Sequence, residues 1–449
     1  MKFRKFGKAL LMSAVSVGLV LGVTSCVQSY TVGFLFVTGT STAGNGQGII
    51  SAFKIDHNTG NLKPVNGMPV GSGGSNPGRA VLAVGSRFVY VLNRGTDPAT
   101  NGPCTAATTD CNGANISEFA VGGSGVLAFQ AQFFSQGMNP FRILVDGQNN
   151  YLYVLDAVAP SGEGCSAALG PTVTTCGDIT AFKIDQSTGR LSLLVNAQVT
   201  SATGNPLPYF PVPVDPIDMV LTASYIYTLS GTPATGDAVF PYAFNSSSGQ
   251  LTITQNSSQP INAAQGTAIA SASGNIYVLD NEPITIPAGD SRNFPPGTYL
   301  SQILPFTPGT GGALQAQTGG AVPDDPNQSS PVVLIAESKG KWVYVANQGP
   351  NTMGTVAQSG IVGYVVDPST HQLTPMAGSP FSMGSGPQCL LEDTSNQFFY
   401  TANFNDSTVT GRTLDANSGV LNGLKGKTGA QSFKLDGPAA WCFVSGRTS

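Results

Sequence analysis

A short aromatic and β-branched segment recurs along this chain and constrains its fold more than any other feature. Its clearest copy is Lys341-Trp-Val-Tyr-Val-Ala-Asn347. Its composition, and the Gly, Asn or Asp residues around it, favour a β-strand. Self-similarity at roughly 40–60 residues is typical of a repeat architecture. The other copies begin at Phe34, Arg87, Tyr151, Ile226, Asn275 and Gln397.

Each full repeat contains four predicted strands. In the unit that spans residues 140–199, they cover residues 142–146, 151–155, 178–184 and 191–197. Apolar and β-branched runs separated by turn residues support this division.

A turn of the form Asp-x-x-Thr-Gly-x-Leu joins the third and fourth strands of several repeats. In one unit it begins at Asp185 and has Gly189 at its fifth position. The Asp side chain can accept backbone N–H bonds, and Gly supplies the positive φ that the turn requires. One copy has His371 in place of Gly, and His tolerates the left-handed region better than most residues. Related turns begin at Asp56, Asn245, Asp367 and Asp415.

Seven units can be counted, which predicts an all-β fold, a seven-bladed β-propeller with four-stranded blades. The first unit lacks an initial strand, whereas the last is followed by an extra one at residues 437–444. We therefore expect the C-terminal strand to join the N-terminal blade, which closes the ring and removes an open sheet edge. The units begin near Phe34, Gly78, Pro140, Pro216, Gly266, Pro331 and Pro387.

The segment Tyr344-Val-Ala-Asn347 and the Asp-x-x-Thr-Gly-x-Leu turns resemble the YVTN-type repeats of bacterial seven-bladed propellers. All seven units are similar to the lactonase family, which includes 6-phosphogluconolactonase-like and muconate-lactonizing propellers. The resemblance implies the fold strongly and the activity only weakly, since many functions share propellers.

The N-terminus reads as a targeting segment. Residues 2–8 are basic, residues 9–23 are apolar but short for a membrane span, and Val23-Thr24-Ser25-Cys26 resembles a bacterial lipobox. We predict a signal peptide at residues 1–25, a lipid-anchored Cys26, a short tether at residues 26–33, and one propeller domain at residues 34–449. The predicted location is the bacterial cell envelope, outside the cytoplasm, in the outer membrane or periplasm. An ordinary secretory signal or a single anchor helix are the alternatives.

The charge balance disfavours nucleic acid as a partner. The chain has 20 basic and 24 acidic side chains, and removing Lys2, Arg4, Lys5 and Lys8 leaves 20 − 4 = 16 basic residues, a net charge of about −8. No Lys/Arg run follows, whereas phosphate binding needs clustered cations.

The remaining six cysteines suit an oxidising compartment. Cys104 and Cys111 share one predicted loop, and Cys165 and Cys176 share the corresponding loop of the next repeat, so we expect two local disulfides. Cys389 and Cys442 lie in first strands and either pair or remain buried thiols. Spacings unlike Cys-x-x-Cys argue against zinc. No metal and no cofactor is expected.

Long insertions collect on one face of the predicted ring, which usually marks a binding face. Drift of unconstrained loops is the other explanation. The insertions span residues 94–114, 157–177, 201–215, 281–299 and 348–360.

The innermost strands begin on the same face, and the third residue of some of them is charged. Arg79 and Arg142 occupy that position in two units and Asp218 in a third. The resemblance implies that such positions line the channel mouth. Two guanidiniums beside carboxylates could bind the carboxylate of a sugar acid or lactone, or they could bridge neighbouring blades through Asp156 or Asp218. The second strands also end on this face and bring Asn93, Arg94, Asp156, Asp280, Glu282, Asn347 and Asn403.

Two functions follow as hypotheses. The first is a lipid-anchored binding or scaffold propeller that takes a small sugar acid, a lactone or an envelope macromolecule at its mouth. The predicted ligand-binding residues are Arg79, Arg142, Asp156, Asp218, Asp280, Glu282, Asn347 and Asn403.

The second is a lactonase, a carboxylic-ester hydrolase, with Arg79, Arg142 and Asp218 as catalytic candidates. The only histidines, His57 and His371, lie in turns on the opposite face. A lactonase would therefore need a carboxylate base or an activated water. A purely structural envelope protein is a third reading and would have no pocket.

Overall fold

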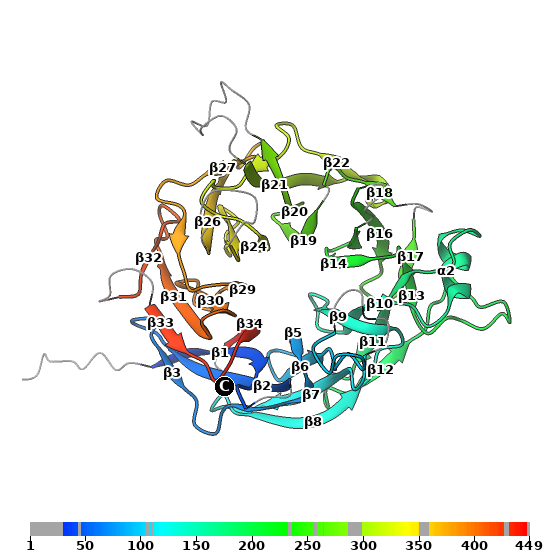
Figure 1. The fold of residues 1–449 in the computed structure, drawn as a ribbon, viewed down its shortest axis with the longest axis horizontal. Helices are drawn as coiled ribbons and strands as arrows, with labels where there is room; N and C mark the ends of the chain where they lie inside the picture. The colour runs from blue at the N-terminus through cyan, green and yellow to red at the C-terminus, as the bar shows by residue number, and fades with distance from the viewer. Residues whose placement is uncertain are drawn as a thin grey trace, which may run out of the picture.

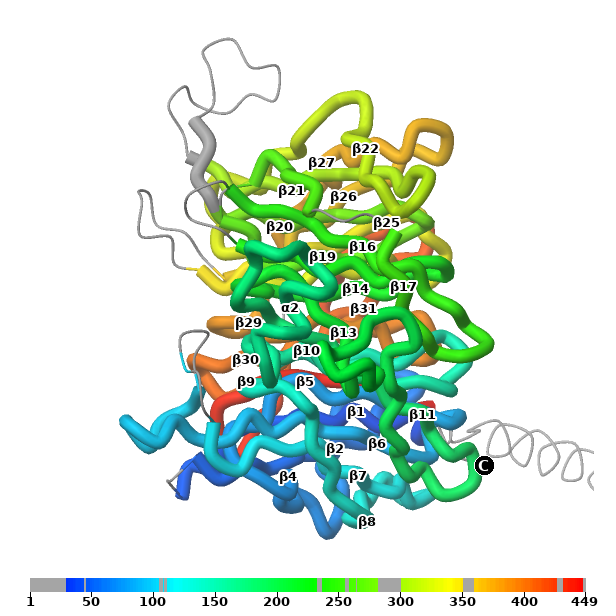
Figure 2. The backbone as a smooth tube through the Cα atoms, turned by 90° about the vertical axis from the view of Figure 1, so that its right-hand side faces the viewer, coloured from blue at the N-terminus to red at the C-terminus, as the bar shows by residue number. Residues whose placement is uncertain are grey.

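The computed structural model describes residues 30–43, 46–104, 108, 111–231, 236–254, 258–263, 265–285, 299–349, 359–425 and 431–446, and for residues 282–285 and 299 it describes the backbone alone. Seven antiparallel sheets stand in a ring around a central axis (Figure 1). The strands run from one face of the ring toward the other (Figure 2). The predicted seven-bladed β-propeller is therefore confirmed.

The two inner strands of each blade follow a common order. The innermost strands are β34 (Ala439–Gly446), β5 (Pro77–Ala83), β9 (Met138–Val145), β14 (Pro216–Leu221), β19 (Gly266–Ala272), β24 (Pro331–Ala336) and β29 (Pro387–Glu392). The second strands are β1 (Thr31–Thr40), β6 (Phe88–Asn93), β10 (Tyr151–Val158), β15 (Tyr225–Ser230), β20 (Asn275–Thr285), β25 (Trp342–Asn347) and β30 (Phe398–Asn403).

Beyond the third strand, the outer part of most blades consists of short strands. The third strands are β2 (Gln47–Asp56), β7 (Asn115–Val121), β11 (Gly177–Ile184), β16 (Ala238–Phe244), β21 (Tyr299–Pro308), β26 (Gly360–Val366) and β31 (Thr408–Leu414). The fourth strands are β3 (Leu62–Pro64), β8 (Leu127–Phe133), β12 (Leu191–Leu194), β17 (Leu251–Ile253), β22 (Leu314–Ala316), β27 (Leu373–Pro375) and β32 (Leu421–Gly423). Six short strands also pair with third strands: β4 (Val70–Ser75), β13 (Phe210–Val212), β18 (Gln259–Pro260), β23 (Val322–Pro323), β28 (Phe381–Ser382) and β33 (Gln431–Lys434).

The second strands are the most buried, which explains why they carry the repeated segment. All six residues of β6, of β25 and of β30 are buried. A strand packed by neighbouring blades on both faces reads as a continuous apolar run instead of an alternating one. Among the described residues, one apolar cluster fills each of the seven blade-to-blade interfaces.

The two repeated motifs meet across these interfaces. The Tyr344 hydroxyl of β25 donates to the Gly419 carbonyl, in the turn before β32 of the next blade, at 2.5 Å. The Tyr153 and Tyr400 hydroxyls bind Gly249 and Gly60 in the same way, at 2.8 and 2.6 Å, and Tyr90 binds Gly189. Each of these glycines has a φ between 69° and 77°, and aromatic rings leave no room for a Cβ there. The glycine is therefore required by its conformation and by its contact.

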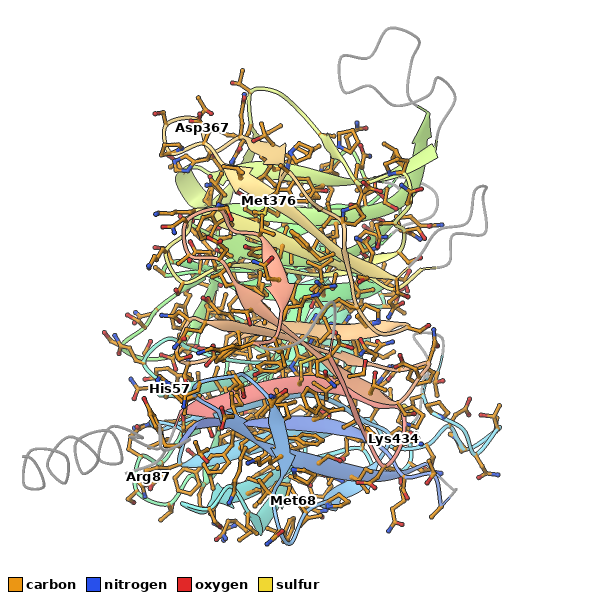
Figure 3. All side chains as sticks on the ribbon, turned by 90° about the vertical axis from the view of Figure 1, so that its left-hand side faces the viewer. His57, Met68, Arg87, Asp367, Met376 and Lys434 are labelled. Carbon is orange, nitrogen blue, oxygen red and sulfur yellow. A yellow bond between two sulfur atoms is a disulfide. The ribbon has the colours of Figure 1, made fainter. Side chains whose placement is uncertain are left out.

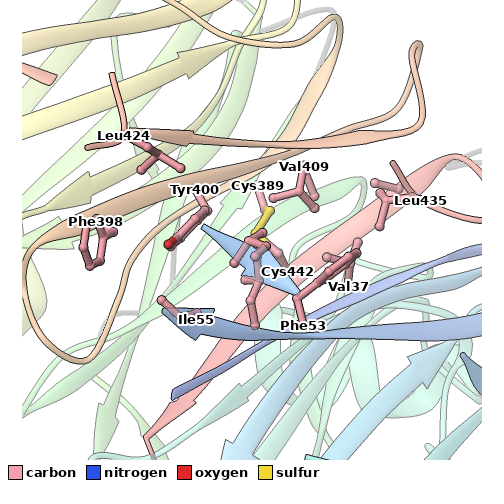
Figure 4. Packing of buried hydrophobic residues seen from close by; sticks show 14 residues of the cluster. Val37, Phe53, Ile55, Cys389, Phe398, Tyr400, Val409, Leu424, Leu435 and Cys442 are labelled. Carbon is pink, nitrogen blue, oxygen red and sulfur yellow. A yellow bond between two sulfur atoms is a disulfide. The ribbon is translucent and has the colours of Figure 1, made fainter. Parts of the chain in front are cut away.

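The ring closes as the sequence predicts. β34 pairs with β1 in antiparallel register, with Val37 opposite Cys442. Cys442 also forms a disulfide with Cys389 of β29, in the preceding blade. Figure 4 shows this disulfide inside the apolar cluster between the last blade and the first. The alternative of two buried free thiols is therefore not realised.

One helix was not anticipated. The predicted loop at residues 157–177 contains α2 (Gly162–Leu169), and a 3-10 turn, η1 (Thr310–Gly312), precedes β22. The Cys165–Cys176 disulfide joins α2 to the start of β11, and Leu207 and Tyr209 complete a small apolar cluster around it. Within the described ranges, no helix is long and apolar enough to cross a membrane.

Candidate functional site

A cavity of about 610 Å³ opens at the channel mouth, where the innermost strands begin. Six of the seven blades contribute to its wall. The lining residues are Thr40, Ser41, Gly46, Asn76, Pro77, Gly78, Arg79, Arg94, Pro103, Phe141, Arg142, Thr267, Val332, Gln348, Gln388, Phe404, Pro438, Ala439, Ala440 and Trp441.

Two of the predicted residues, Arg79 and Arg142, bind the carboxylate of a third, Asp218. The Arg79 guanidinium binds both oxygens of Asp218, with Nη1 at 3.1 Å from Oδ1 and Nη2 at 3.2 Å from Oδ2. Arg142 donates from Nε to Oδ1 at 2.9 Å. Asp218 is only 1% exposed, whereas the arginine side chains are 16% and 24% exposed and line the cavity. The arginines therefore bridge blades through Asp218, as one of the two alternatives predicts. Because both also line the cavity, ligand binding by them stays a prediction.

The local backbone explains why these third residues meet. Arg142 and Asp218 each follow an irregularity in pairing just after a proline of the innermost strand, Pro140 or Pro216. The first β5 pairs show the same shift, which includes Arg79. A β-bulge bends a strand and re-aims a side chain. Asp218 is further held by the backbone N–H groups of Met219, at 2.9 Å, and Ile269, at 3.3 Å.

Aromatic rings cover the two arginines. The Arg79 guanidinium lies 4.6 Å from the centre of the Trp441 ring, and the Arg142 guanidinium lies 5.3 Å from the Phe141 ring. Such cation–π contacts fix the orientation of a guanidinium. Burial lowers the pKa of Arg79 to about 10 against the opposing effect of Asp218, so Arg79 stays charged at neutral pH.

A third guanidinium, that of Arg94, completes the charged side of the cavity. Its Nη2 donates to Asn139 Oδ1 at 3.2 Å, and its buried Nε has no hydrogen-bond partner among the described residues. Burial, and then the charge of Arg142, lower its pKa to about 10. The sequence placed Arg94 at the end of a second strand but gave no reason to select it, because the repeat pattern contains no arginine there.

The remaining predicted residues do not line the cavity. Asp156, Asp280, Asn347 and Asn403 are each 0% exposed. They lie in or at the end of second strands, directly opposite third strands. Most hydrogen-bond within their blades: Asp280 accepts from Gln302 at 2.8 Å, and Asn403 donates to Thr408 at 3.0 Å. Hydrogen bonds within the blades therefore explain why most of these positions are polar. The Glu282 side chain lies outside the described residues.

Among the described residues, no side chain of the cavity wall could act as a general base. Its described residues include neither His nor Asp, Glu, Lys or Cys, and Asp218 lies behind the arginines. His57 and His371 lie in turns between third and fourth strands, as predicted. In the side view of Figure 3, His57 and Lys434 lie on opposite faces of the ring. No group of three His, Cys, Asp or Glu residues in the described part is arranged to hold a metal ion.

All six described cysteines are paired. Cys104–Cys111 and Cys165–Cys176 are the predicted local disulfides, and Cys389–Cys442 is the third. Disulfides are typical of proteins from oxidising compartments. The predicted lipidation site, Cys26, lies outside the described residues.

Comparison with known proteins identifies relatives by structure alone. No protein-family model matches the sequence, and no curated protein matches it either. The solved structures that resemble it include a periplasmic gluconolactonase from Pseudomonas aeruginosa, with 16% identity, a TM-score of 0.61, and coverage of 93% of this chain and 100% of that one. A Bacteroides fragilis protein provisionally assigned as a 6-phosphogluconolactonase has 16% identity, a TM-score of 0.61, and coverage of 92% and 98%.

A third similar structure, of a Lactobacillus plantarum protein, has 17% identity, a TM-score of 0.58, and coverage of 92% and 99%. At such identities the likeness concerns the fold, which is that of lactonase-like propellers. The activities of these proteins say nothing about the mouth of this chain.

Proposed function

Starting from a lactonase-like propeller fold, we propose that this protein is an extracytoplasmic binding module that takes a small sugar acid in its mouth cavity. One observation carries the proposal: Arg79, Arg94 and Arg142 line the cavity, and Asp218 is the one carboxylate paired with any of them in the described residues. Three guanidiniums against one carboxylate leave two positive charges for a ligand. Guanidinium groups bind carboxylates with charge-assisted hydrogen bonds.

The charge of the whole chain strengthens this argument. The formal net charge is −4, yet three of its arginines gather in one concave site. Clefts lined by one sign of charge concentrate ligands of the opposite sign. An acidic small molecule is therefore attracted to the mouth while the rest of the surface repels it.

Binding without turnover is favoured over lactone hydrolysis. Opening a lactone requires a base that activates water, within hydrogen-bond reach of it. The described wall of the cavity has no such side chain. A lactone would fit the arginines through its oxygens but would not be hydrolysed there.

The N-terminal segment adds the second half of the proposal. A basic run, a short apolar run and the Ser25-Cys26 junction match a lipidated leader, so the propeller would be tethered to a membrane by acyl chains at Cys26. Mass spectrometry of the protein from membranes should find a lipidated N-terminal Cys26, and Cys26→Ser should move the protein to the soluble fraction. An unmodified Cys26 would contradict the anchor.

The binding proposal is tested by thermal denaturation of the Cys26→Ser protein with glucuronate, gluconate and gluconolactone. A ligand at about 100 times its Kd stabilises the native state by about 2.7 kcal/mol, so the melting temperature should rise measurably. Arg142→Gln should remove the shift. Arg87→Gln is the matched control, because Arg87 is an exposed side chain that binds Gln186 and Ser187 carbonyls away from the cavity.

No shift with any acid would overturn the binding proposal. Release of gluconate from gluconolactone above the uncatalysed rate, lost in Arg142→Gln, would show a lactonase instead.

A further inference from the structure

We infer that the mouth cavity binds an oligosaccharide whose terminal unit is a uronic acid, in preference to a free lactone or aldonic acid. Such a ligand has an acidic end and a neutral end. The inference rests on the proposed function and extends it from one acidic group to the whole ligand. It follows from the uneven distribution of side chains around the cavity.

The acidic end is assigned to Arg94 and Arg142. Arg79 already uses Nη1 and Nη2 on Asp218, so it holds the cluster together. Arg142 uses Nε on Asp218 and Nη1 on the Phe141 carbonyl, at 3.1 Å, which leaves Nη2. The buried Nε of Arg94 has no partner within the described chain. An unsatisfied buried donor is costly unless a ligand supplies the acceptor.

The opposite side of the cavity is neutral. Gln348 of the β25 end and Gln388 of β29 line it, are half-buried, and make no side-chain hydrogen bond to any described residue. Phe404, just after β30, is 48% exposed and also lines it. Carboxamides can donate to and accept from neighbouring hydroxyls, and an exposed ring offers an apolar face to the C–H face of a sugar.

The size of the cavity favours more than one sugar ring. A volume of about 610 Å³ equals roughly 20 water molecules at ~30 Å³ each, which exceeds what one monosaccharide displaces. A ligand bound at Arg94 and Arg142 would therefore continue toward Phe404. Because the described cations line only one side, only the terminal unit needs to be acidic.

A peptide with a free C-terminus is disfavoured by the backbone of the rim. Peptides bind through main-chain hydrogen bonds to open strand edges. At the inner rim, the Gly78 carbonyl already accepts from Thr38, at 2.8 Å, and the Pro331 carbonyl accepts from Thr267. These two main-chain acceptors of the described rim are therefore already used, which favours recognition through side chains.

Calorimetric titration of the Cys26→Ser protein tests the inference. The acidic ligands are glucuronic acid and an aldobiouronic and an aldotriouronic acid that end in glucuronate. Xylotriose and trialanine are the neutral-sugar and peptide ligands for comparison. Affinity should rise at least tenfold from glucuronic acid to the aldotriouronic acid. Arg94→Gln should weaken every acidic ligand at least tenfold, as expected for a lost charge-assisted hydrogen bond. Phe404→Ala should weaken the aldotriouronic acid several-fold and leave glucuronic acid unchanged.

The controls separate this inference from the proposed function. Arg87→Gln should bind all ligands as the wild type does, and near-native circular dichroism would show that Arg94→Gln and Phe404→Ala are folded. Equal affinity for glucuronic and aldotriouronic acids, tighter binding of xylotriose, or trialanine binding as tightly as the aldotriouronic acid would overturn the inference while leaving acid binding intact. Binding of no acid at all would overturn both.

Discussion

Asp218 is the residue on which the geometry of the mouth depends. It comes from β14, yet it holds Arg79 of β5 and Arg142 of β9, and the Ile269 N–H of β19 donates to it. Four successive blades therefore share one buried carboxylate. A charge buried with its partners is a weak source of net stability, but removing one partner is expensive because the other charges stay behind.

We expect Asp218→Asn to lower the free energy of unfolding by about 3 kcal/mol. The amide leaves two guanidiniums beside each other without a counter-ion. Urea unfolding measures the change, and Arg79→Gln, which leaves Asp218 paired with Arg142, should cost less. An unchanged free energy of unfolding in Asp218→Asn would show that water, and not Asp218, solvates the charges of Arg79 and Arg142.

Buried carboxyl groups should make stability depend on pH. Burial raises the pKa of Asp156, and burial together with the charge of Asp156 raises the pKa of its neighbour Asp178. Burial also raises the pKa of Asp324 from 3.8 to about 7. Between these values these groups bind more protons in the native state than in the unfolded state. The stability that they contribute is therefore present below about pH 4 and is lost as the pH rises through about 7.

Asp178→Asn should flatten this dependence, because one of the paired carboxyl groups no longer ionises. At pH 8 the variant should be more stable than the wild type, because its amide does not ionise beside Asp156. Urea unfolding of both proteins from pH 4 to 8 is the measurement. Equal changes of stability with pH in the two proteins would contradict the raised pKa of Asp178.

At the scale of elements, a tyrosine from a second strand and a glycine from the next blade's turn form the repeated joint. The joint needs the Asp-x-x-Thr-Gly turn, in which the Asp or Asn side chain accepts backbone N–H bonds, as Asp415 does at 2.9 and 3.1 Å. Tyr227 of β15 faces a blade whose turn lacks this motif, and its buried hydroxyl has no partner among the described residues.

Tyr344→Phe should therefore cost about 1 kcal/mol, because a buried hydrogen bond to Gly419 is lost. Tyr227→Phe is the matched control and should be neutral or stabilising, because it removes a hydroxyl that is buried without a partner. Thermal and urea unfolding of both variants give the comparison. Equal losses in the two would show that the joint depends on packing alone.

At the scale of the whole molecule, the ring is closed twice between its last and first blades. β34 completes the first sheet, and Cys389–Cys442 links the innermost strands of the two blades that meet there. A ring has no terminal interface to protect, so its stability depends on keeping this seam shut.

Removing this disulfide should destabilise the protein more than removing a loop disulfide. Cys389 and Cys442 are 53 residues apart, whereas Cys104 and Cys111 are 7 apart. Chain entropy gives about 4 kcal/mol for the first and about 2 kcal/mol for the second. Paired Cys→Ala variants, compared by urea unfolding, measure the difference. A greater loss on removing Cys104–Cys111 would contradict the role of the seam.

Most of the fold could be predicted from the sequence. Strand positions, the turns with Gly189 or His371, the count of seven units and the closing C-terminal strand all follow from patterns of a few neighbouring residues, repeated along the chain. Such patterns are local, so no knowledge of distant contacts is needed to read them. The repeat pattern does not predict α2, because this eight-residue helix lies inside one loop and does not recur in the described part of the other units.

The site could be predicted only in part. The sequence by itself determined which side chains stand where innermost strands begin, and so it brought Arg79, Arg142 and Asp218 to one face. Only the tertiary structure decided that Arg79 and Asp218, 139 residues apart, form an ion pair, that Arg94 joins the cavity, and that Asp156 and Asp280 do not. The reason is physical: whether a polar side chain faces the axis or its own blade depends on bulges and on packing between blades, which involve residues from several repeats at once.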